Sequence, residues 1–324
     1  MIRADDFATL EEALIAASTP FATPAGTEMR GQIVQLSARD YDIYQRLLLP
    51  VGVTMQGEGP QATRIRCYNG GGIDLSQQMT SSGVLENGWQ ANSVRDLRLE
   101  NQTATSMAPA ILSVGGGGSL LERLVINGFG VGVDLWGCDE VDVDGVYIGS
   151  YAGYGVAGSN SIGVRFRGEA NANSLNRCKF NGPAVAIAHD GGACNEVSNC
   201  RTNSGRVVIS SANELSFHKC YWEGVAGAEF VKVEGSPGQV VAYGLRLRDC
   251  YMAGNAPAVR FAPGTVTYGF TWADSQLAGT APEGSSIVIG DIYCLPGPSD
   301  FRGSVYLGGG PLMNMASAGG VLSP

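Results

Sequence analysis

The chain has 324 residues, including 47 glycines; only 16% of the residues are charged, and the net charge is −9 at pH 7. Many glycines between short apolar runs favour an all-β chain with tight turns over disorder or long helices. The acidic balance without a Lys/Arg cluster argues against nucleic acid as a partner, and the lack of a run of 18 apolar residues argues against membrane insertion.

The first residues, Met1-Ile-Arg-Ala-Asp-Asp, lack the basic segment and apolar run of an export signal. Eight cysteines are few for a disulfide scaffold in a chain of this length, and they are expected to be free interior thiols. We therefore expect folding in a reducing cytoplasm without a signal peptide, unless the sequence is cut from a longer exported protein.

A single helix is predicted at the N-terminus. Thr9 and Glu12 have the spacing of a capping box, and Leu10, Ala13, Leu14 and Ala17 form an apolar stripe. The helix is expected to end between residues 18 and 20. From about Gln32 the apolar period falls to two, which predicts the first strands between Ile33 and Ile43.

A loose repeat runs through most of the remaining chain. Each copy has an apolar residue, two variable residues, then Leu, Val, Cys or Ser, one further residue, and a mostly apolar residue. The eight copies are Val94/Leu97/Leu99, Leu121/Leu124/Ile126, Val143/Val146/Ile148, Leu175/Cys178/Phe180, Val197/Cys200/Thr202, Phe217/Cys220/Trp222, Leu247/Cys250/Met252 and Trp272/Ser275/Leu277. Many are followed by glycine and a second alternation such as Val131-Gly-Val133-Asp-Leu135, so two or three short strands per copy are implied.

One such unit cannot bury its apolar side alone, whereas stacked copies can share a continuous core. The uneven spacing between copies fits a β-helix, in which insertions enter at the turns without disturbing the stacked strands. The predicted fold class is therefore all-β, a right-handed parallel β-helix (solenoid) with an N-terminal capping α-helix. A β-sandwich is the alternative, because alternation separated by turns also fits that fold.

The segment Leu49-Pro-Val-Gly-Val-Thr-Met-Gln-Gly-Glu-Gly-Pro-Gln-Ala-Thr63 resembles the first coil of the pectate-lyase-like superfamily, which also contains many bacteriophage tailspikes. The segment Phe7 to Ala17 is similar to the family's capping helix. The resemblance implies a cap with the first strands at 1–45, a β-helix at 46–298, and a last coil or the start of a trimerisation segment at 299–324. It also implies a homotrimer.

The sequence departs from this family in two respects. Ser37-Ala-Arg-Asp-Tyr41 stands where the family often has a Pro-x-Gly-x-Tyr turn. The dense motifs of pectin lyases and polygalacturonases are missing, so the family's catalytic residues cannot be assigned here. The resemblance therefore implies a fold far more than a reaction.

No metal or other cofactor is expected. Cys178, Cys200, Cys220 and Cys250 occupy the repeat position and are predicted to form an interior row of small side chains; the role of Cys138, outside that register, is left open. Asp142 and Asp144 alternate with valine before Gly145, which resembles part of a calcium loop. A solvated strand face explains the same alternation and is favoured over a weak calcium site.

The candidate site follows from the second strand of each coil, where residues between inward apolar ones should point outward. Stacking is expected to align Asp134, Arg165, Lys232 and Arg260, flanked by Trp136, Arg167, Asp190 and Glu234. We predict that the four cations, Arg165, Arg167, Lys232 and Arg260, bind acidic sugars, that Trp136 stacks on a sugar ring, and that Asp190, Glu234 and Asp134 supply acid–base catalysis. A solvent-exposed ion ladder without function is the alternative.

His189 is expected at a cleft edge, and His218 at the surface.

Three functions remain open at this point. The first is a tailspike-like protein on the virion surface that binds, and in its catalytic form cleaves, a host surface polysaccharide. The second is a secreted bacterial polysaccharide lyase or glycoside hydrolase. The third is a non-catalytic structural spike or adhesin, which the absence of a recognisable catalytic set supports.

Overall fold

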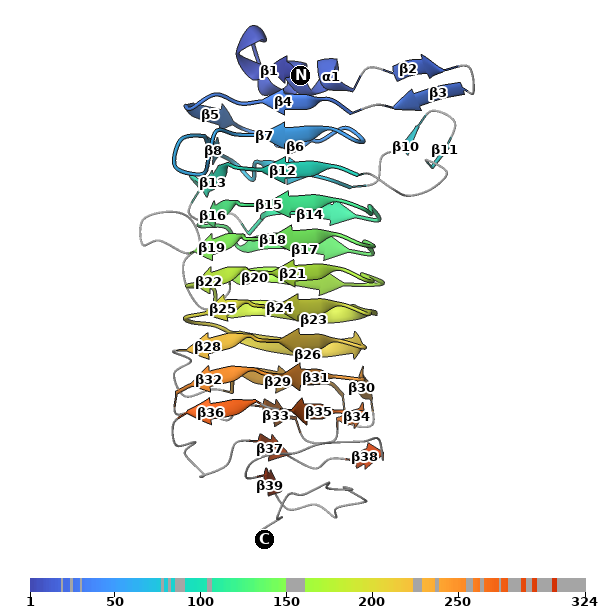
Figure 1. The fold of residues 1–324 in the computed structure, drawn as a ribbon, viewed down its shortest axis with the longest axis vertical. Coiled ribbons are helices and arrows are strands. Elements are labelled where there is room, and N and C mark those ends of the chain that lie inside the picture. The colour runs from blue at the N-terminus through green and yellow to red at the C-terminus, as the bar shows by residue number, and fades with distance from the viewer. Residues whose placement is uncertain are drawn as a thin grey trace. The chain divides into compact units, whose positions relative to one another are not determined.

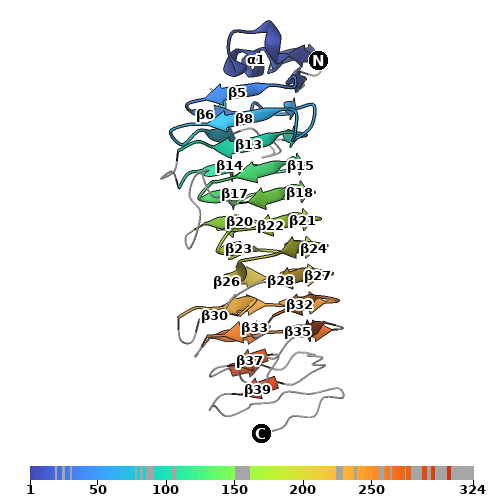
Figure 2. The ribbon, with the colours of Figure 1, turned by 90° about the vertical axis from the view of Figure 1, so that its left-hand side faces the viewer.

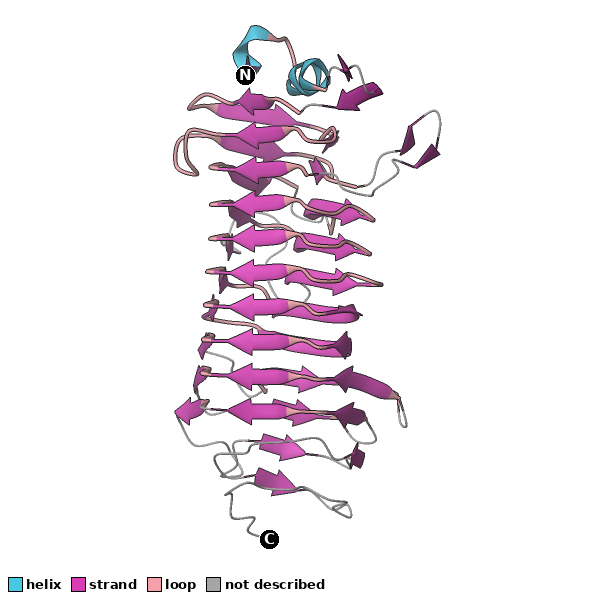
Figure 3. Cartoon of the chain, turned by 45° about the vertical axis from the view of Figure 1, so that its right-hand side comes forward, coloured by secondary structure: helices cyan, strands magenta, loops and turns pink. Residues whose placement is uncertain are grey.

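The structure is a computed structural model in which two compact units are formed by Met1–Ser161 and Ile162–Pro324. It describes residues 1–18, 20–23, 26–29, 31–76, 79–80, 83–84, 91–103, 107–149, 161–223, 229–236, 239–254, 259–262, 265–273, 275–278, 287–289, 293–295 and 305–307. Strands dominate both units, and the described helices lie near the N-terminus (Figure 3).

The first unit contains three parallel sheets and two short antiparallel hairpins (Figure 1). Sheet 1a has the order β1 (Ile2–Arg3), β4 (Ile33–Gln35), β7 (Thr54–Gln56), β12 (Ser93–Arg95), β15 (Leu120–Glu122), β18 (Asp142–Asp144). Sheet 2a has β5 (Asp40–Ile43), β8 (Arg64–Cys67), β13 (Arg98–Asn101), β16 (Val125–Asn127), β19 (Tyr147–Gly149). Sheet 3a has β6 (Arg46–Leu48), β9 (Gly72–Asp74), β14 (Pro109–Val114), β17 (Val131–Trp136). The hairpins are β2 (Pro20–Thr23) with β3 (Gly26–Met29), and β10 (Met79–Thr80) with β11 (Gly83–Val84).

The second unit also contains three parallel sheets, whose strands lie one above another in Figure 2. Sheet 1b has β21 (Ser174–Asn176), β24 (Glu196–Ser198), β27 (Ser216–His218), β31 (Arg246–Arg248), β35 (Thr271–Ala273). Sheet 2b has β22 (Lys179–Asn181), β25 (Arg201–Thr202), β28 (Tyr221–Glu223), β32 (Tyr251–Ala253), β36 (Gln276–Ala278). Sheet 3b has β20 (Ile162–Arg167), β23 (Val185–Ala193), β26 (Arg206–Asn213), β29 (Val231–Val233), β33 (Val259–Phe261), β37 (Ile287–Ile289), β39 (Val305–Leu307). A branch from β26 adds β30 (Val240–Tyr243), β34 (Val266–Tyr268) and β38 (Tyr293–Leu295) to sheet 3b.

In each unit the chain passes through the three sheets in turn and returns one strand further along, so that one coil stacks on the next. This is a right-handed parallel β-helix, and the predicted fold class is confirmed. The β-sandwich alternative is wrong, because a sandwich pairs its strands antiparallel whereas the three main sheets of both units are parallel.

The repeat positions form the core. Every member of the eight copies whose side chain the structure describes is buried. The strand register places successive copies directly above one another, as in Val197 opposite Phe217 and Phe217 opposite Leu247. The first predicted strand is out of phase, however, because Val34 rather than Ile33 is the buried residue of β4.

The helix α1 (Leu10–Ala17) follows a short 3-10 helix, η1 (Ala4–Asp6). The Thr9 hydroxyl accepts from the Glu12 backbone N–H, and the Glu12 carboxylate accepts from the Thr9 N–H, which confirms the capping box. The predicted apolar stripe is buried against β1 and β4. Among the described helices, none has both the length and the apolar character needed to cross a membrane.

The four repeat cysteines, Cys178, Cys200, Cys220 and Cys250, are buried and form no disulfide, and we call them the cysteine ladder. Cys178, Cys200 and Cys220 follow one another on successive coils, and contacts with Cys178 and Cys220 raise the pKa of the Cys200 thiol. The predicted interior row is confirmed. Cys138 is also buried, and its thiol donates to the Ser113 carbonyl at 3.0 Å.

The Cys194 thiol is exposed, whereas Cys67, Cys138 and the cysteine ladder are buried. We expect a thiol reagent to label Cys194 in the native protein while the cysteine ladder reacts only after unfolding. A hydrogen bond to Glu214 raises the Cys194 pKa, so the labelling rate should keep rising above the ordinary thiol pKa. Timed labelling of the wild type and of Cys194→Ser tests this, and native labelling of Cys200 or Cys220 would contradict it.

Candidate functional site

Three of the four predicted cations lie in one line on the outer face of sheet 3b. Residues opposite one another on neighbouring strands run Arg165, Ala188, Val208, Lys232 and Arg260. Arg165, Lys232 and Arg260 are each partly exposed. The structure thus aligns three of the predicted residues, with Ala188 and Val208 separating Arg165 from Lys232.

A second line runs beside the first and carries two of the three predicted carboxylates, Asp190 and Glu234. Arg167 lies opposite Asp190, and the Glu234 N–H donates to the Ile209 carbonyl at 2.9 Å. Ser210, between the two carboxylates, donates its hydroxyl to Asp190 Oδ1 at 2.9 Å. Asp190, Ser210 and Glu234 therefore come from three successive coils.

The pairing of β23 with β26 is irregular beside this second line, and the irregularity positions Ser210. His189 lies opposite Ile209, whereas the next residue, Asp190, lies opposite Ser211, so that Ser210 is an extra residue in β26. A β-bulge of this kind reorients side chains and is common beside functional sites. Here it allows the Ser210 hydroxyl to reach Asp190.

Ion pairs connect both lines to their surroundings. The Lys232 ammonium pairs with the Glu234 carboxylate. Arg260 Nε lies 3.3 Å from Glu229 Oε2, and Arg206 Nη1 lies 3.0 Å from Glu229 Oε1. Because the Glu229 side chain is only 8% exposed, Arg260 neutralises a buried carboxylate as well as facing the surface. It is thus less available to a ligand than the sequence indicates.

His189 lies beneath this face and not at a cleft edge as expected, since it is 1% exposed. Its Nδ1 donates to the Ser211 carbonyl at 2.7 Å, so its Nε2 accepts from the Asn195 amide at 3.0 Å. Asn195 in turn accepts from the Asn173 amide at 3.0 Å. Burial lowers the His189 pKa to about 4, which keeps the ring neutral and its bond to the bulge intact.

The two predicted residues in the first unit have opposite environments. Trp136 is 47% exposed at the end of β17. Asp134 is 1% exposed, so the expectation that its carboxylate faces solvent is wrong. It lies between the inward residues Val133 and Leu135 and is in electrostatic contact with the partly buried Arg46, which accounts for a charge at this position.

Asp142 and Asp144 flank the buried Val143 on β18, as a solvated strand face requires. In the part of the chain that the structure describes, no group of three or more His, Cys, Asp and Glu side chains is arranged to hold a metal ion. His218 is a partly exposed residue whose Nε2 lies 3.1 Å from Asp249 Oδ2, in agreement with the surface position expected for it.

Sequence reasoning missed an aromatic line on the outer face of sheet 2b. Arg201, Tyr221 and Tyr251 lie opposite one another on β25, β28 and β32. The Tyr221 and Tyr251 rings stack at a centroid distance of 5.4 Å, and the Arg201 guanidinium lies 4.9 Å from the Tyr221 centroid. The signal was present in the sequence, because each of these residues directly follows a repeat cysteine and must point away from the core.

The outer face of sheet 3b has the chemistry for an acidic glycan. Four cations accompany two solvent-accessible carboxylates in a protein whose net charge is −9. Asp190 and Glu234 belong to coils two strand spacings apart, which separates their backbones by about 9–10 Å. Inverting glycosidases place their two carboxyl groups roughly 6.5–9.5 Å apart, with room for a water molecule between them and the sugar.

No family model matches the sequence, and no curated protein is similar to it in sequence. The three-dimensional structure, in contrast, is similar to solved structures. An alginate lyase from Paenibacillus sp. str. FPU-7 has a TM-score of 0.56 at 12% identity, covering 86% of this chain and 95% of that one. The Streptococcus pneumoniae surface protein and adhesin PfbA has a TM-score of 0.56 at 10% identity, covering 94% and 99%.

A GH87 α-1,3-glucanase catalytic domain in complex with tetrasaccharides has a TM-score of 0.54 at 10% identity. The match covers 88% of this chain but only 57% of the glucanase domain. What these proteins share with the chain is the fold. At such low identity the likeness assigns no reaction, and the chemistry has to be argued from the residues of this β-helix.

Proposed function

We propose that the outer face of sheet 3b binds an acidic polysaccharide and that Asp190 and Glu234 cleave it. The observation that carries the proposal is the placement of Asp190, Ser210 and Glu234 on three successive coils beside a line of cations. A glycan chain running along the coils meets both carboxylates and, on the adjacent line, Arg165 and Lys232.

The two carboxylates have different surroundings, which suggests different roles. The Lys232 ammonium pairs with the Glu234 carboxylate and holds it in place, so we assign Glu234 as the general base that activates water. Asp190, which accepts the Ser210 hydroxyl, is then assigned as the group that protonates the leaving glycosidic oxygen. The cations bind the uronate or other acidic groups of the substrate.

The finer proposal is a tailspike-like protein on the virion surface, assembled as a homotrimer. The cysteine ladder supports folding in a reducing compartment, because stacked cysteines on neighbouring strands remain thiols. Polysaccharide-cleaving enzymes and a surface adhesin share the fold, which supports an extracellular glycan as the partner. The mass of the purified protein in solution tests the trimer.

Incubation with capsular polysaccharides, lipopolysaccharides and alginate tests the reaction. New reducing ends without absorbance near 235 nm are expected, as hydrolysis produces. New reducing ends with that absorbance would show an eliminating lyase and overturn the hydrolytic roles. Binding without either signal would favour a non-catalytic spike or adhesin and overturn the catalytic proposal.

Lys232→Ala is expected to weaken binding of an acidic glycan by about two- to fivefold, because a partly exposed charge contributes modestly. The loss should shrink as salt is raised, since salt screens the charge. Lys179→Ala is the matched control, an exposed lysine on sheet 2b. Equal losses in the two variants, measured by titration calorimetry at two salt concentrations, would place binding elsewhere.

A further inference from the structure

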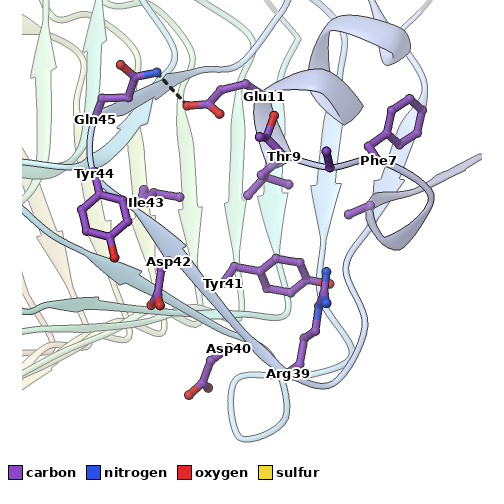
Figure 4. Close-up of a pocket in the computed structure, with 13 residues that line it drawn as sticks. Phe7, Thr9, Glu11, Arg39, Asp40, Tyr41, Asp42, Ile43, Tyr44 and Gln45 are labelled. Carbon is purple, nitrogen blue, oxygen red and sulfur yellow. Dashed lines mark hydrogen bonds between the residues drawn. The ribbon is translucent and has the colours of Figure 1, made fainter.

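A pocket of about 540 Å³ lies at the end of sheet 2a in the first unit, and none of its residues belongs to the proposed glycan site (Figure 4). One wall is the segment from Arg39 to Gln45, which contains β5, and the other is the segment from Phe7 to Glu11 at the start of α1. The Gln45 amide donates to Glu11 Oε1 at 2.8 Å and closes one end of the pocket. The proposed cleavage reaction leaves this pocket unused.

The wall formed by β5 is a strand edge that no other described strand covers. Among the described strands β5 pairs with β8 alone and is the last strand of its sheet. The carbonyls of Arg39 and Ile43 accept from β8 and its continuation, at 3.0 and 2.9 Å. Because backbone groups alternate in direction along a strand, those of Asp40 and Asp42 point to the other edge, into the pocket. The helix α1 packs on β1 and β4 and caps sheet 1a instead.

The side chains next to this edge specify what could pair with it. On the outer face, Asp40 is paired with Arg64 and Asp42 with Arg66, each through two hydrogen bonds. A further strand with basic residues opposite Asp40 and Asp42 would continue this alternation of charge. Between these two aspartates Tyr41 is turned inward and 8% exposed, and Leu10 lines the opposite wall, so the residue facing them must be apolar.

We propose that the free edge of β5 binds an extended segment of a partner protein as an added parallel strand, with a basic–apolar–basic pattern opposite Asp40, Tyr41 and Asp42. Main-chain hydrogen bonds to the edge provide affinity and the alternating side chains provide specificity, as in other cases of strand addition. Such a segment would attach the N-terminal end of the β-helix to the protein that carries it.

The chain itself supplies a suitable probe. β8 already pairs with β5 and has the required pattern, so we use the fluorescently labelled peptide Thr-Arg-Ile-Arg-Ser, which is residues 63–67 with Ser in place of Cys67. Saturable binding to the full chain is expected by fluorescence anisotropy. Ala8→Trp, which fills the pocket without changing β5, should weaken binding at least about tenfold. Ile15→Trp, at a 68% exposed position of α1 outside the pocket, should not.

Methylating the isoleucine amide of the peptide removes a hydrogen-bond donor that a parallel added strand needs, and should abolish binding. Unchanged binding of the methylated peptide, or equal binding to the wild type and Ala8→Trp, would overturn the proposal. So would competition by a neutral oligosaccharide, which would make the pocket a sugar site. The experiment contains no glycan substrate, so its outcome is independent of the proposed cleavage.

Discussion

Replacing Asp190 with Asn, or Glu234 with Gln, is expected to reduce polysaccharide cleavage by about 10²–10⁴-fold, the usual contribution of one acid–base group. Each substitution keeps the shape of the side chain and removes its ability to transfer a proton. Both carboxylates lie on the outer face, so the thermal midpoint of unfolding should not change measurably. Initial rates of reducing-end formation, with thermal unfolding in parallel, measure the two effects.

Glu196→Gln is the matched control, because Glu196 is an exposed carboxylate on a different sheet of the same unit. It should cleave at the wild-type rate. Ser210→Ala should cleave more slowly than Glu196→Gln but faster than Asp190→Asn, since it removes the hydrogen bond to Asp190 but leaves both carboxylates in place. Full activity in both Asp190→Asn and Glu234→Gln would show that the reaction takes place elsewhere on the protein.

The core was predictable because burial repeats at a fixed position in each coil. A parallel β-helix stacks equivalent residues, so the same buried position recurs in every coil. Cys200 and Cys220 could therefore be predicted as neighbours from the sequence alone. The helix α1 was predictable for a different reason: its capping box is a local signal between Thr9 and Glu12 that does not depend on the rest of the fold.

The candidate site was predictable only in part. The alternation of apolar and polar residues correctly placed Arg165, Lys232 and Arg260 in one line. It carries no information about whether other parts of the fold cover the outer face of a strand. Asp134 therefore had the pattern of an outward residue and is nevertheless buried. The ion pair from Arg260 to Glu229 joins residues on neighbouring coils, and no local pattern in the sequence marks it.

The β-bulge at Ser210 could not be predicted from the sequence either. A one-residue shift of register moves side chains between faces, and here it is accommodated within β26 by hydrogen bonds that reach across coils. His189 makes one of them, to the Ser211 carbonyl. The sequence predicted His189 at a cleft edge, whereas in the structure His189 is an interior residue and its neighbour Asp190 is exposed.

That separation predicts a pH dependence of stability. The His189 pKa is about 4 in the folded protein because of burial, and an unfolded histidine has a pKa of about 6.5. Between these values the unfolded state binds a proton that the folded state does not, so stability falls as pH is lowered from about 7 towards 4. From pH 7.5 to pH 5 the expected loss from this one residue is about 2 kcal/mol.

Urea unfolding at pH 7.5 and pH 5 measures the loss, and the protein supplies its own control because it has two histidines. In His218→Gln, which removes the partly exposed histidine, the loss should persist. In His189→Gln the loss should disappear, while stability at pH 7.5 falls because the bond to Ser211 is changed. A wild-type protein that is equally stable at both pH values would contradict the burial of a neutral His189 beneath the bulge.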